Sequence, residues 1–414
     1  MTSLTADLNL KGIFRRISVL FIFLLNCEVT VVGTALGEIK KAFPGADPVL
    51  ISLVYTFPIL IMVFMNFFVV PPLAKRYNKK SLVMVALVFY ILGGIGGAFV
   101  IGNLFQIIVM RTLVGIGAGL SAPLCGAIIN ELYEGLDKKN MLGWANGVDS
   151  LMAIGFTMVA GVLVAIKWNY VFFVYSFFVI VLLMIATSLP SLPAPAAAEA
   201  SETKKVKLSY NGKQRFKLFL VCLYDAAFTI FLVVVMIKLA IFVTDEKLGD
   251  PVIVATAMST LTAGILVGSF LFGLAEKLFR RYNLVVSPLL VGIGAFIMYG
   301  ANAMTPVFTG CFIVGLGAGI NLPLVQSRGL AIGLKTDGTF ANAMVIGVMN
   351  GGQFLATFAE KGVGLFVEPT ARNLIGSVSI AMAAIAVVCI TYIIADPMKG
   401  VNAKSEAEAI AEIA

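Results

Sequence analysis

The sequence predicts an all-α integral membrane protein with twelve transmembrane helices, arranged as two similar bundles of six. Three observations predict this fold: an apolar composition, twelve apolar segments of spanning length, and a glycine-rich motif that recurs about 200 residues later. The chain of 414 residues is 60% hydrophobic and 13% charged, with a mean hydropathy of +1.00. Soluble domains are about 45–50% apolar and about 25% charged, so this composition favours a protein embedded in a bilayer.

Each apolar segment is long enough to cross a bilayer, which takes about 20 residues of helix. Very short turns separate the third segment from the fourth, at Asn103, and the fifth from the sixth, at 167–169. We expect the first segment to be a span and not a cleaved signal peptide, because it is long and lacks a small-residue cleavage site before a polar stretch. The expected spans are 17–37, 50–71, 81–102, 104–128, 143–166, 170–190, 218–243, 252–275, 284–301, 306–330, 340–359 and 373–395.

The basic residues predict the orientation of the spans. If the N-terminus is cytoplasmic and the chain crosses twelve times, 21 of the 30 Lys and Arg residues fall in inner segments and six in outer segments. Positive charge gathers on the cytoplasmic side of membrane proteins, so we expect both termini in the cytoplasm and the protein in the cell (inner) membrane. The net charge of +8 mostly reflects this anchoring and does not indicate nucleic-acid binding. The exceptions are Lys40, Lys41, Lys167, Lys247, Lys361 and Arg372 in outer segments, and Arg111, Lys238 and Arg328 within spans.

One long inner loop leaves six spans before it and six after it. The loop is rich in Pro and Ala and then basic, which is typical of a flexible linker between bundles. We therefore expect an N-terminal six-helix bundle at 1–190, a cytoplasmic linker at 191–217, and a C-terminal six-helix bundle with a cytoplasmic tail at 218–414. Repeated halves are the architecture of many secondary transporters, in which the substrate binds near the bilayer midplane.

The recurring motif is GIGAGLSAPL at 115–124 and GLGAGINLPL at 315–324, in the fourth span of each half. A glycine-rich run can cradle a phosphate, but a dinucleotide loop needs a preceding strand and a βαβ unit. These glycines lie inside apolar spans, where small residues let helix backbones approach closely. The sequence therefore favours helix packing as the role of Gly115, Gly117, Gly119, Gly315, Gly317 and Gly319.

The loop after the second span reads PPLAKRYNKK, and GLAEKLFRR follows the eighth span. The first of these resembles the loop between the second and third helices of major facilitator superfamily permeases, Gly-x-Leu-Ala-Asp-Arg-x-Gly-Arg-Lys. The resemblance to this family extends over essentially the whole chain. Lys75 stands where the family has an acid, whereas the second copy keeps the acid. The resemblance implies a role in conformational change for these loops, at Leu73, Lys75, Arg76, Lys79, Lys80, Glu276, Arg280 and Arg281.

Other local patterns agree with this resemblance. RTLVGIGA, from Arg111, matches the Arg-x-x-x-Gly-x-Gly-Ala motif of the family's fourth helix, and WNYVFFV matches the entry to its sixth. EVTVVGTALGEI is similar to the first helix of proton-coupled drug exporters, with Glu28 at the position of the acid. Phe156 and Thr157 replace the Gly-Pro pair that is usual in the fifth helix of exporters, so the direction of transport stays open.

Two charged residues within the spans are candidates for proton coupling. Glu28 lies near the middle of the first span, where a carboxylate is costly and usually functional. It serves as a proton or cation site or, alternatively, belongs to a structural ion pair. Arg111 resembles the family arginine that is tied to proton coupling, and the alternative is again a structural pair between helices.

Other polar residues within the spans are candidates for a substrate cavity. The two aspartates either line the cavity or cap a cytoplasmic helix end, and the four amides either bind substrate or link helices. Lys238 and Arg328 lie nearer the span ends, so we expect their side chains to extend toward the lipid headgroups. The candidate cavity residues are Asp225, Asp149, Asn321, Gln326, Asn350 and Gln353.

Other chemistries find little support in the sequence. The chain has no His, which excludes His-based catalytic dyads, and its five Cys residues show no metal or disulfide spacing. No Gly-x-x-x-x-Gly-Lys-Ser/Thr loop is present, so we expect an ion gradient and not ATP as the energy source. We therefore expect no enzyme activity, no cofactor and no metal, and a monomer whose partners are protons, lipid and a small molecule.

The sequence leaves three functions to consider. The favoured one is proton-coupled efflux of small amphipathic compounds by alternating access. Uptake by symport, or exchange, of a small organic acid or other metabolite is the alternative within the transporter class. A membrane sensor or scaffold that does not transport is the alternative from another class, and the embedded charges argue against it because a scaffold does not need them.

Overall fold

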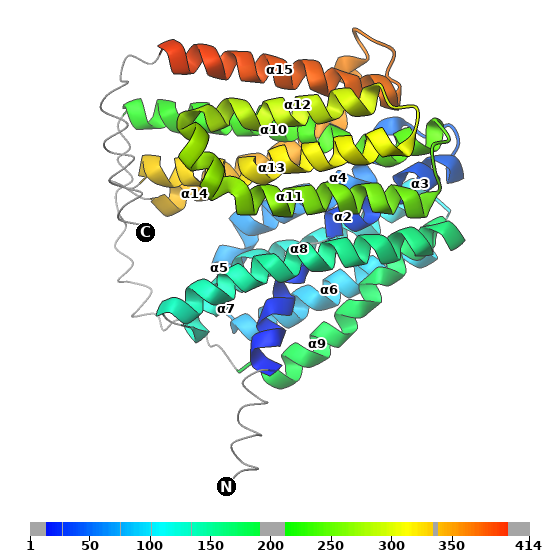
Figure 1. Ribbon diagram of the computed structural model, residues 1–414. Helices are drawn as coiled ribbons and strands as arrows, with labels where there is room; N and C mark the ends of the chain where they lie inside the picture. The colour runs from blue at the N-terminus through cyan, green and yellow to red at the C-terminus, as the bar shows by residue number, and fades with distance from the viewer. Residues whose placement is uncertain are drawn as a thin grey trace. The chain divides into compact units, whose positions relative to one another are not determined.

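The computed structural model describes residues 14–26, 28–74, 76–100, 102–133, 135–190, 212–333 and 338–395, and within them all regular secondary structure is helical (Figure 1). In the first half, residues 14–22 are helical and are followed by η1 (Phe23–Asn26), α2 (Glu28–Gly33), α3 (Leu36–Ala42), α4 (Pro48–Phe64), η2 (Met65–Val69), α5 (Val70–Ala74), α6 (Lys79–Phe99), α7 (Leu104–Leu132), α8 (Gly135–Ile166), η3 (Trp168–Ser176) and α9 (Phe177–Ser188). The second half contains α10 (Gly212–Asp245), α11 (Pro251–Phe279), η5 (Arg280–Tyr282), α12 (Asn283–Tyr299), α13 (Met304–Gly333), α14 (Gly338–Val363) and α15 (Ala371–Ala395).

These helices match the twelve expected spans, and the all-α fold is confirmed. Among the described residues, nine helical stretches are long and apolar enough to cross a membrane. One of them, Pro251–Tyr299, contains both the eighth and the ninth expected spans, and the shorter apolar helix Met344–Ala359 corresponds to the eleventh. The first expected span is not one continuous helix, because it is divided among residues 14–22, η1, α2 and α3.

Asparagine and aspartate side chains begin three of the spans. The side chains of Asp47, Asn78 and Asn103 accept hydrogen bonds from the backbone N–H groups two residues later, at 2.9 Å in each case. Such caps satisfy N–H groups that have no partner within the first turn of a helix. Asn103 thereby starts α7 directly after α6 ends, which explains how so short a turn connects two spans.

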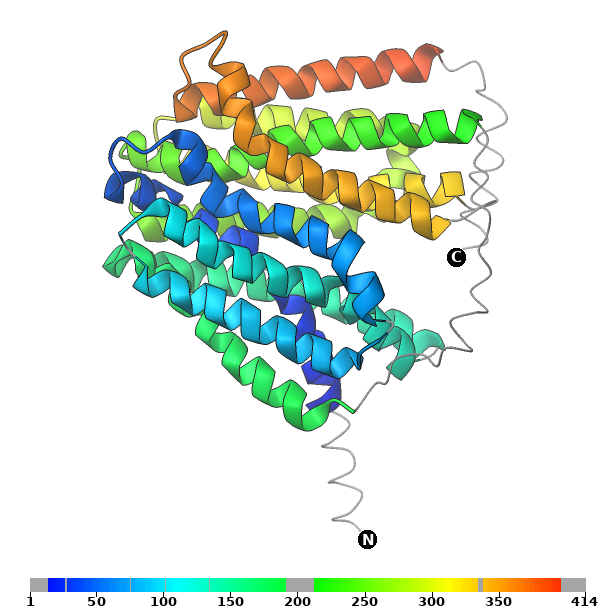
Figure 2. The ribbon, with the colours of Figure 1, turned by 180° about the vertical axis from the view of Figure 1, so that it is seen from behind.

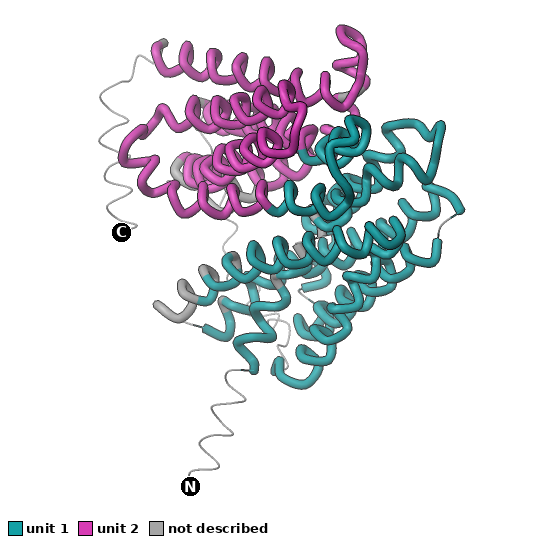
Figure 3. The backbone as a smooth tube through the Cα atoms, turned by 45° about the vertical axis from the view of Figure 1, so that its right-hand side comes forward, with its two compact units in different colours: residues 1–204, 236–259 teal, residues 205–235, 260–414 magenta. Residues whose placement is uncertain are grey.

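The chain forms two compact units, coloured separately in Figure 3. Unit 1 contains residues 1–204 and 236–259, and unit 2 contains residues 205–235 and 260–414. The division therefore crosses α10 and α11, so that residues 236–259 belong with the first half of the sequence. The expected linker at 191–217 lies largely outside the described residues, so the two six-helix bundles joined by it stay a prediction.

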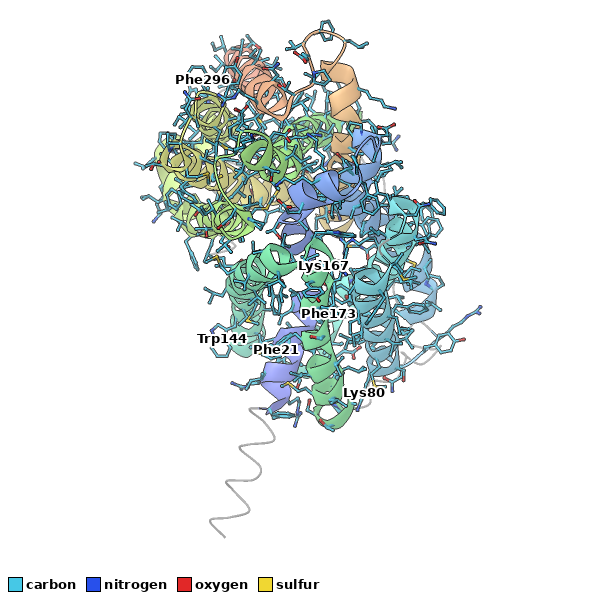
Figure 4. All side chains as sticks on the ribbon, turned by 90° about the vertical axis from the view of Figure 1, so that its right-hand side faces the viewer. Phe21, Lys80, Trp144, Lys167, Phe173 and Phe296 are labelled. Atoms are coloured by element: carbon cyan, nitrogen blue, oxygen red, sulfur yellow. The ribbon has the colours of Figure 1, made fainter. Side chains whose placement is uncertain are left out.

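Within each unit, long helices pack side by side. In unit 1, α7 contacts both α4 and α6. In unit 2, α12 lies between α13 and α15 and contacts both (Figure 1), and the view from behind shows α14 in orange on the reverse face (Figure 2). Large apolar side chains project from the sides of the helices, as Trp144 on α8 and Phe296 on α12 do (Figure 4), at 52% and 66% exposure. Apolar surfaces of this kind suit contact with lipid.

Candidate functional site

The first glycine motif lies where α7 meets its two neighbours. A Cβ atom added to Gly115 would come within 2.6 Å of the carbonyl oxygen of Pro58 on α4, and one added to Gly117 within 2.5 Å of that of Ala86 on α6. Gly119 faces η2 in the same way. Side chains at these positions would push the helices apart, so the glycines permit backbone contact on two faces of α7.

The second glycine motif repeats this arrangement in unit 2. A Cβ atom at Gly315 or Gly319 would overlap backbone carbonyl groups of α11, and one at Gly317 would lie 2.7 Å from the carbonyl oxygen of Ser287 on α12. The alternation is therefore the same in both halves. The first and third glycines contact the helix two spans earlier in the sequence, and the middle glycine contacts the helix of the span immediately before. Equivalent packing explains why nearly the same ten residues occur twice.

Arg111 is completely buried within unit 1. Its Nε donates to the carbonyl oxygen of Val54 on α4 at 3.0 Å, and its Nη1 donates to the hydroxyl of Tyr175 on η3 at 2.6 Å. The ring of Tyr175 also contacts Tyr90 on α6, with ring centroids 5.2 Å apart. The guanidinium therefore links three segments of unit 1 through neutral groups.

The other charged candidates of unit 1 are placed less fully. Glu28 is the first residue of α2, and its side chain lies outside the described residues. Asp149 lies on α8, is partly exposed, and interacts electrostatically with Cys125 on α7. The structure therefore brings Asp149 toward the α7 face of α8.

Asp225 lies at the centre of a polar cluster in unit 2. Its side chain is 1% exposed, and its Oδ1 accepts a long hydrogen bond of 3.5 Å from Nδ2 of Asn321 on α13. The hydroxyl of Tyr224 donates to Oδ1 of the same Asn321 at 2.9 Å. Thr229, one turn along α10, also bonds to the Asp225 carboxyl group. The second carboxyl oxygen, Oδ2, is buried without a hydrogen-bond partner among the described residues.

Two predicted amides on α14 lie close to this cluster. Gly352 packs against α10 so tightly that a Cβ atom there would lie 3.2 Å from the carbonyl oxygen of Ala226. Asn350 is buried, and its Oδ1 accepts a weak hydrogen bond of 3.4 Å from Nε2 of Gln353. Gln326, one turn and a half beyond Asn321 on α13, is partly exposed. Five of the six predicted cavity residues thus lie on the helices α10, α13 and α14 of unit 2, and Asp149 lies in unit 1.

The two cations near the span ends do not extend freely toward the headgroups. Lys238 is only 5% exposed, so the expectation for this residue is wrong: its side chain is buried within unit 1. Arg328 is partly buried in unit 2 and forms an ion pair of 3.6 Å with Glu276. Hydropathy alone placed both residues near the span ends, whereas tertiary contacts determine where their side chains point.

The basic loop between α5 and α6 is tied to the ends of two other helices. Lys79 is buried and forms an ion pair with Glu131 on α7. The ammonium group of Lys80 donates to the carbonyl oxygens of Ala186 and Leu189 at 2.8 and 2.6 Å, where α9 ends (Figure 4). A cation at this position suits the negative end of a helix.

The remaining residues of this loop form a turn. Leu73 accepts backbone hydrogen bonds from the N–H groups of Arg76 and Tyr77, and the Arg76 side chain is exposed. Lys75 lies outside the described residues. In the corresponding loop of unit 2, Glu276 accepts from Asn283 at 2.7 Å in addition to its ion pair with Arg328.

The basic pair of the second loop occupies η5. Arg280 has a φ of 49°, an uncommon conformation for a residue other than glycine. The guanidinium of the next residue, Arg281, lies 5.7 Å from the ring centroid of Tyr282. The loop therefore turns sharply between α11 and α12.

The sequence did not predict the contact that residues 236–259 make within unit 1. A Cβ atom at Gly37 on α3 would overlap Thr244 on α10, and one at Gly161 on α8 would overlap Ala255 on α11. Beside Gly37, Lys40 forms an ion pair of 2.7 Å with Asp245. Gly37 and Gly161, with Gly33 beside Met258, are sequence signals for this contact, but small residues mark close helix approaches without indicating the partner.

Comparison with known proteins identifies the family. The family model described as the Major Facilitator Superfamily matches residues 18–359, which is most of the chain. The chain belongs to the Major Facilitator Superfamily. Among curated proteins, Multidrug resistance protein 3 of Bacillus subtilis (strain 168) is 22% identical over 352 residues, covering 77% of this chain. The matched part spans only 60% of that relative.

Solved structures of major facilitator proteins share the fold. A bacterial homologue of the human lysosomal transporter Spinster, in an inward-facing and unoccupied conformation, superimposes with a TM-score of 0.70 at 15% identity, covering 92% of this chain and 95% of that chain. A D-xylose-proton symporter gives a TM-score of 0.66 at 13% identity, covering 91% and 96% of the two chains. At such low identity the likeness establishes the fold alone, and the multi-pass membrane transporter class follows from the family match over residues 18–359.

Proposed function

We propose that this transporter exports small neutral or cationic amphipathic compounds in exchange for protons. The observation that carries the preference over small anions is the state of the embedded charges. Arg111 bonds to neutral groups of Val54 and Tyr175, Arg328 is paired with Glu276, and no described ion pair brings a cation to the buried carboxyl group of Asp225. A small dicarboxylate would lose its hydration beside such a group without a compensating cation, which is costly.

The proposed cavity residues are those that the sequence indicated, with Asn321, Asn350 and Gln353 as the polar contacts of unit 2. Aliphatic and aromatic walls would supply most of the affinity through buried apolar area, at roughly 25 cal/mol per Å². The name of the B. subtilis relative supports drug-like substrates, and the proton coupling is proposed for Glu28 and Arg111. Both termini are proposed to be cytoplasmic, with the protein in the inner membrane.

One observation favours a second candidate, the symport or exchange of a small organic acid. Lys238 is buried, and a buried ammonium group would supply the positive charge that a carboxylate substrate needs. Binding to the purified protein separates the candidates. Thermal stabilisation by lipophilic cations and not by oxalate-like or lactate-like anions supports export, whereas the reverse result, abolished in Lys238→Gln, supports the organic-acid function.

A flux measurement tests the transport proposal as a whole. Proteoliposomes with an imposed pH gradient should accumulate a compound that stabilises the purified protein, and Glu28→Gln should abolish accumulation, because an amide keeps the shape of the side chain and cannot bind a proton. Accumulation that is unchanged in Glu28→Gln would remove this residue from the coupling. A protein that binds such compounds but moves none of them would instead be a sensor or scaffold.

The proposed orientation can be tested separately from transport. Single cysteines introduced at Lys204 and Lys247 can be labelled with a membrane-impermeant reagent in intact cells. Labelling at 247 and not at 204 is the expected result. Labelling at 204 and not at 247 would reverse the orientation.

A further inference from the structure

The unit 2 polar cluster defines a chemically incomplete site around Asp225. Of its two carboxyl oxygens, Oδ1 accepts a 3.5 Å hydrogen bond from Asn321, and Oδ2 is buried without a hydrogen-bond partner in the described structure; the hydroxyl of Thr229 is a second neutral group that bonds to the carboxyl group. The hydroxyl of Tyr224 points to Asn321. An ionised carboxylate accepts several hydrogen bonds when it is satisfied. The cluster therefore provides too few donors for a buried carboxylate ion.

The burial of Asp225 limits what can complete the site. The side chain is 1% exposed, and Oδ2 itself is buried. An organic ammonium group needs space beside the oxygen that it contacts, and the neighbouring helices occupy that space, since α14 approaches α10 closely at Gly352. A proton needs no such space. Burial thus favours a proton over a substrate amine as the ligand of Oδ2.

The groups around Asp225 are neutral. On α10 itself the titratable neighbours are Tyr224 and Cys222, and Cys389 on α15 lies near Tyr224. The polar groups on α13 and α14, Asn321 and Asn350, carry no charge. The cation of α13, Arg328, lies two turns from Asn321 and is paired with Glu276. No described ion pair compensates a negative charge on Asp225.

The depth of the cluster is appropriate for proton coupling. Asp225, Asn321 and Asn350 lie 7, 9 and 10 residues from the inner ends of the expected spans 218–243, 306–330 and 340–359. At about 1.5 Å per residue this is roughly 10–15 Å, and the hydrocarbon core is about 30 Å thick. All three expected spans therefore hold the polar group within the hydrocarbon core, where an acid is costly unless it is neutralised or paired.

We propose that Asp225 is a proton-binding site of unit 2, occupied in the conformation described. The proton bonds to Oδ2 and comes from water; it returns to water when a change in the packing of α10 against α13 and α14 exposes the carboxyl group. The proposed export of substrates against protons would use this site as a second coupling residue, and that part of the inference rests on the proposed function. The protonation itself does not.

Infrared spectroscopy of the purified protein tests protonation without any substrate. The carbonyl stretch of a protonated carboxyl group should be present at neutral pH in the wild-type protein and in Glu28→Gln, and absent in Asp225→Asn. Tyr224→Phe loosens Asn321 and should shift this band while leaving it present, which provides a second reading if Asp225→Asn does not fold. A wild-type spectrum without the band, or one that neither variant alters, overturns the proposal.

Transport then tests coupling. For one coupled proton, a gradient of about one pH unit supports about tenfold accumulation, since 1.4 kcal/mol corresponds to tenfold. Asp225→Asn should lose this accumulation and retain exchange of labelled for unlabelled substrate. Accumulation that is retained in Asp225→Asn, with the infrared band lost, overturns the coupling role alone. Absence of transport in the wild-type protein contradicts the proposed function and leaves the infrared result to decide protonation.

Discussion

At the scale of single residues, two buried charged residues of the described spans, Arg111 and Asp225, are held by neutral partners. Arg111 bonds to a backbone carbonyl and a tyrosine, and Asp225 to an amide. The sequence identified both residues, because charged residues are rare in apolar spans. It could not identify Tyr175 or Tyr224 as their neighbours, since tyrosines are common in spans and their contacts depend on how the helices rotate against one another.

The hydrogen bond between Tyr175 and Arg111 is expected to contribute measurably to stability. Tyr175→Phe leaves the aromatic packing in place but removes a hydrogen bond to a charged group, which typically costs about 1.5–3 kcal/mol. We expect a lower unfolding temperature in detergent. Tyr170→Phe is the matched control, because Tyr170 lies on the same η3 segment and packs against Phe173 at 5.5 Å. Equal stability of the two variants would show that the Arg111 bond contributes nothing.

At the scale of helices, hydropathy predicted where most spans lie but not their continuity. Long apolar stretches such as α7 and α13 must satisfy their backbone hydrogen-bonding groups within the stretch itself, so each forms an α-helix in lipid. The break in the first span could not be predicted, because composition does not record backbone geometry. The N–H of Ala35 donates to the carbonyl oxygen of Val32 in a turn between α2 and α3. For the repeated glycines, in contrast, the sequence indicated a role in helix packing. Their position inside an apolar span favours close contact between helices over phosphate binding.

Two glycines of α7 make a direct test of the packing argument. Gly115→Ala places a Cβ atom 2.6 Å from the carbonyl oxygen of Pro58, whereas Gly126→Ala on the same helix meets nothing within 4 Å. Overpacking costs about 1–3 kcal/mol, and an exposed Gly→Ala change in a helix gains up to about 1 kcal/mol. Thermal unfolding should therefore show destabilisation for Gly115→Ala and none for Gly126→Ala. If both variants gain stability, α4 and α7 are not in backbone contact.

At the scale of the whole molecule, the two halves of six spans stay a prediction from the sequence, and the structure adds how parts of the chain associate within each compact unit. Residues 236–259 pack within unit 1 through Gly37 and Gly161. The linker composition signals where the chain is flexible, and it carries no information about which helix ends associate. The proposed alternating-access cycle moves one repeat against the other; since α3 belongs to the first half of the sequence and α10 to the second, we expect the contact between α3 and the end of α10 to separate and re-form in each turnover.

The ion pair of Lys40 with Asp245 offers a way to hold that contact closed. Both side chains are more than 40% exposed and their charged atoms lie 2.7 Å apart, so Lys40→Cys with Asp245→Cys should react with a short bifunctional thiol reagent. Covalent linkage across α3 and α10 should then abolish transport in proportion to the linked fraction, while substrate still binds. The matched control is Lys41→Cys with Glu38→Cys, because that ion pair of 2.8 Å lies within α3 and linking it constrains no other helix. Full transport by the linked Lys40–Asp245 variant would mean that this contact stays intact throughout the cycle, and the separation required by alternating access would then have to occur elsewhere in the protein.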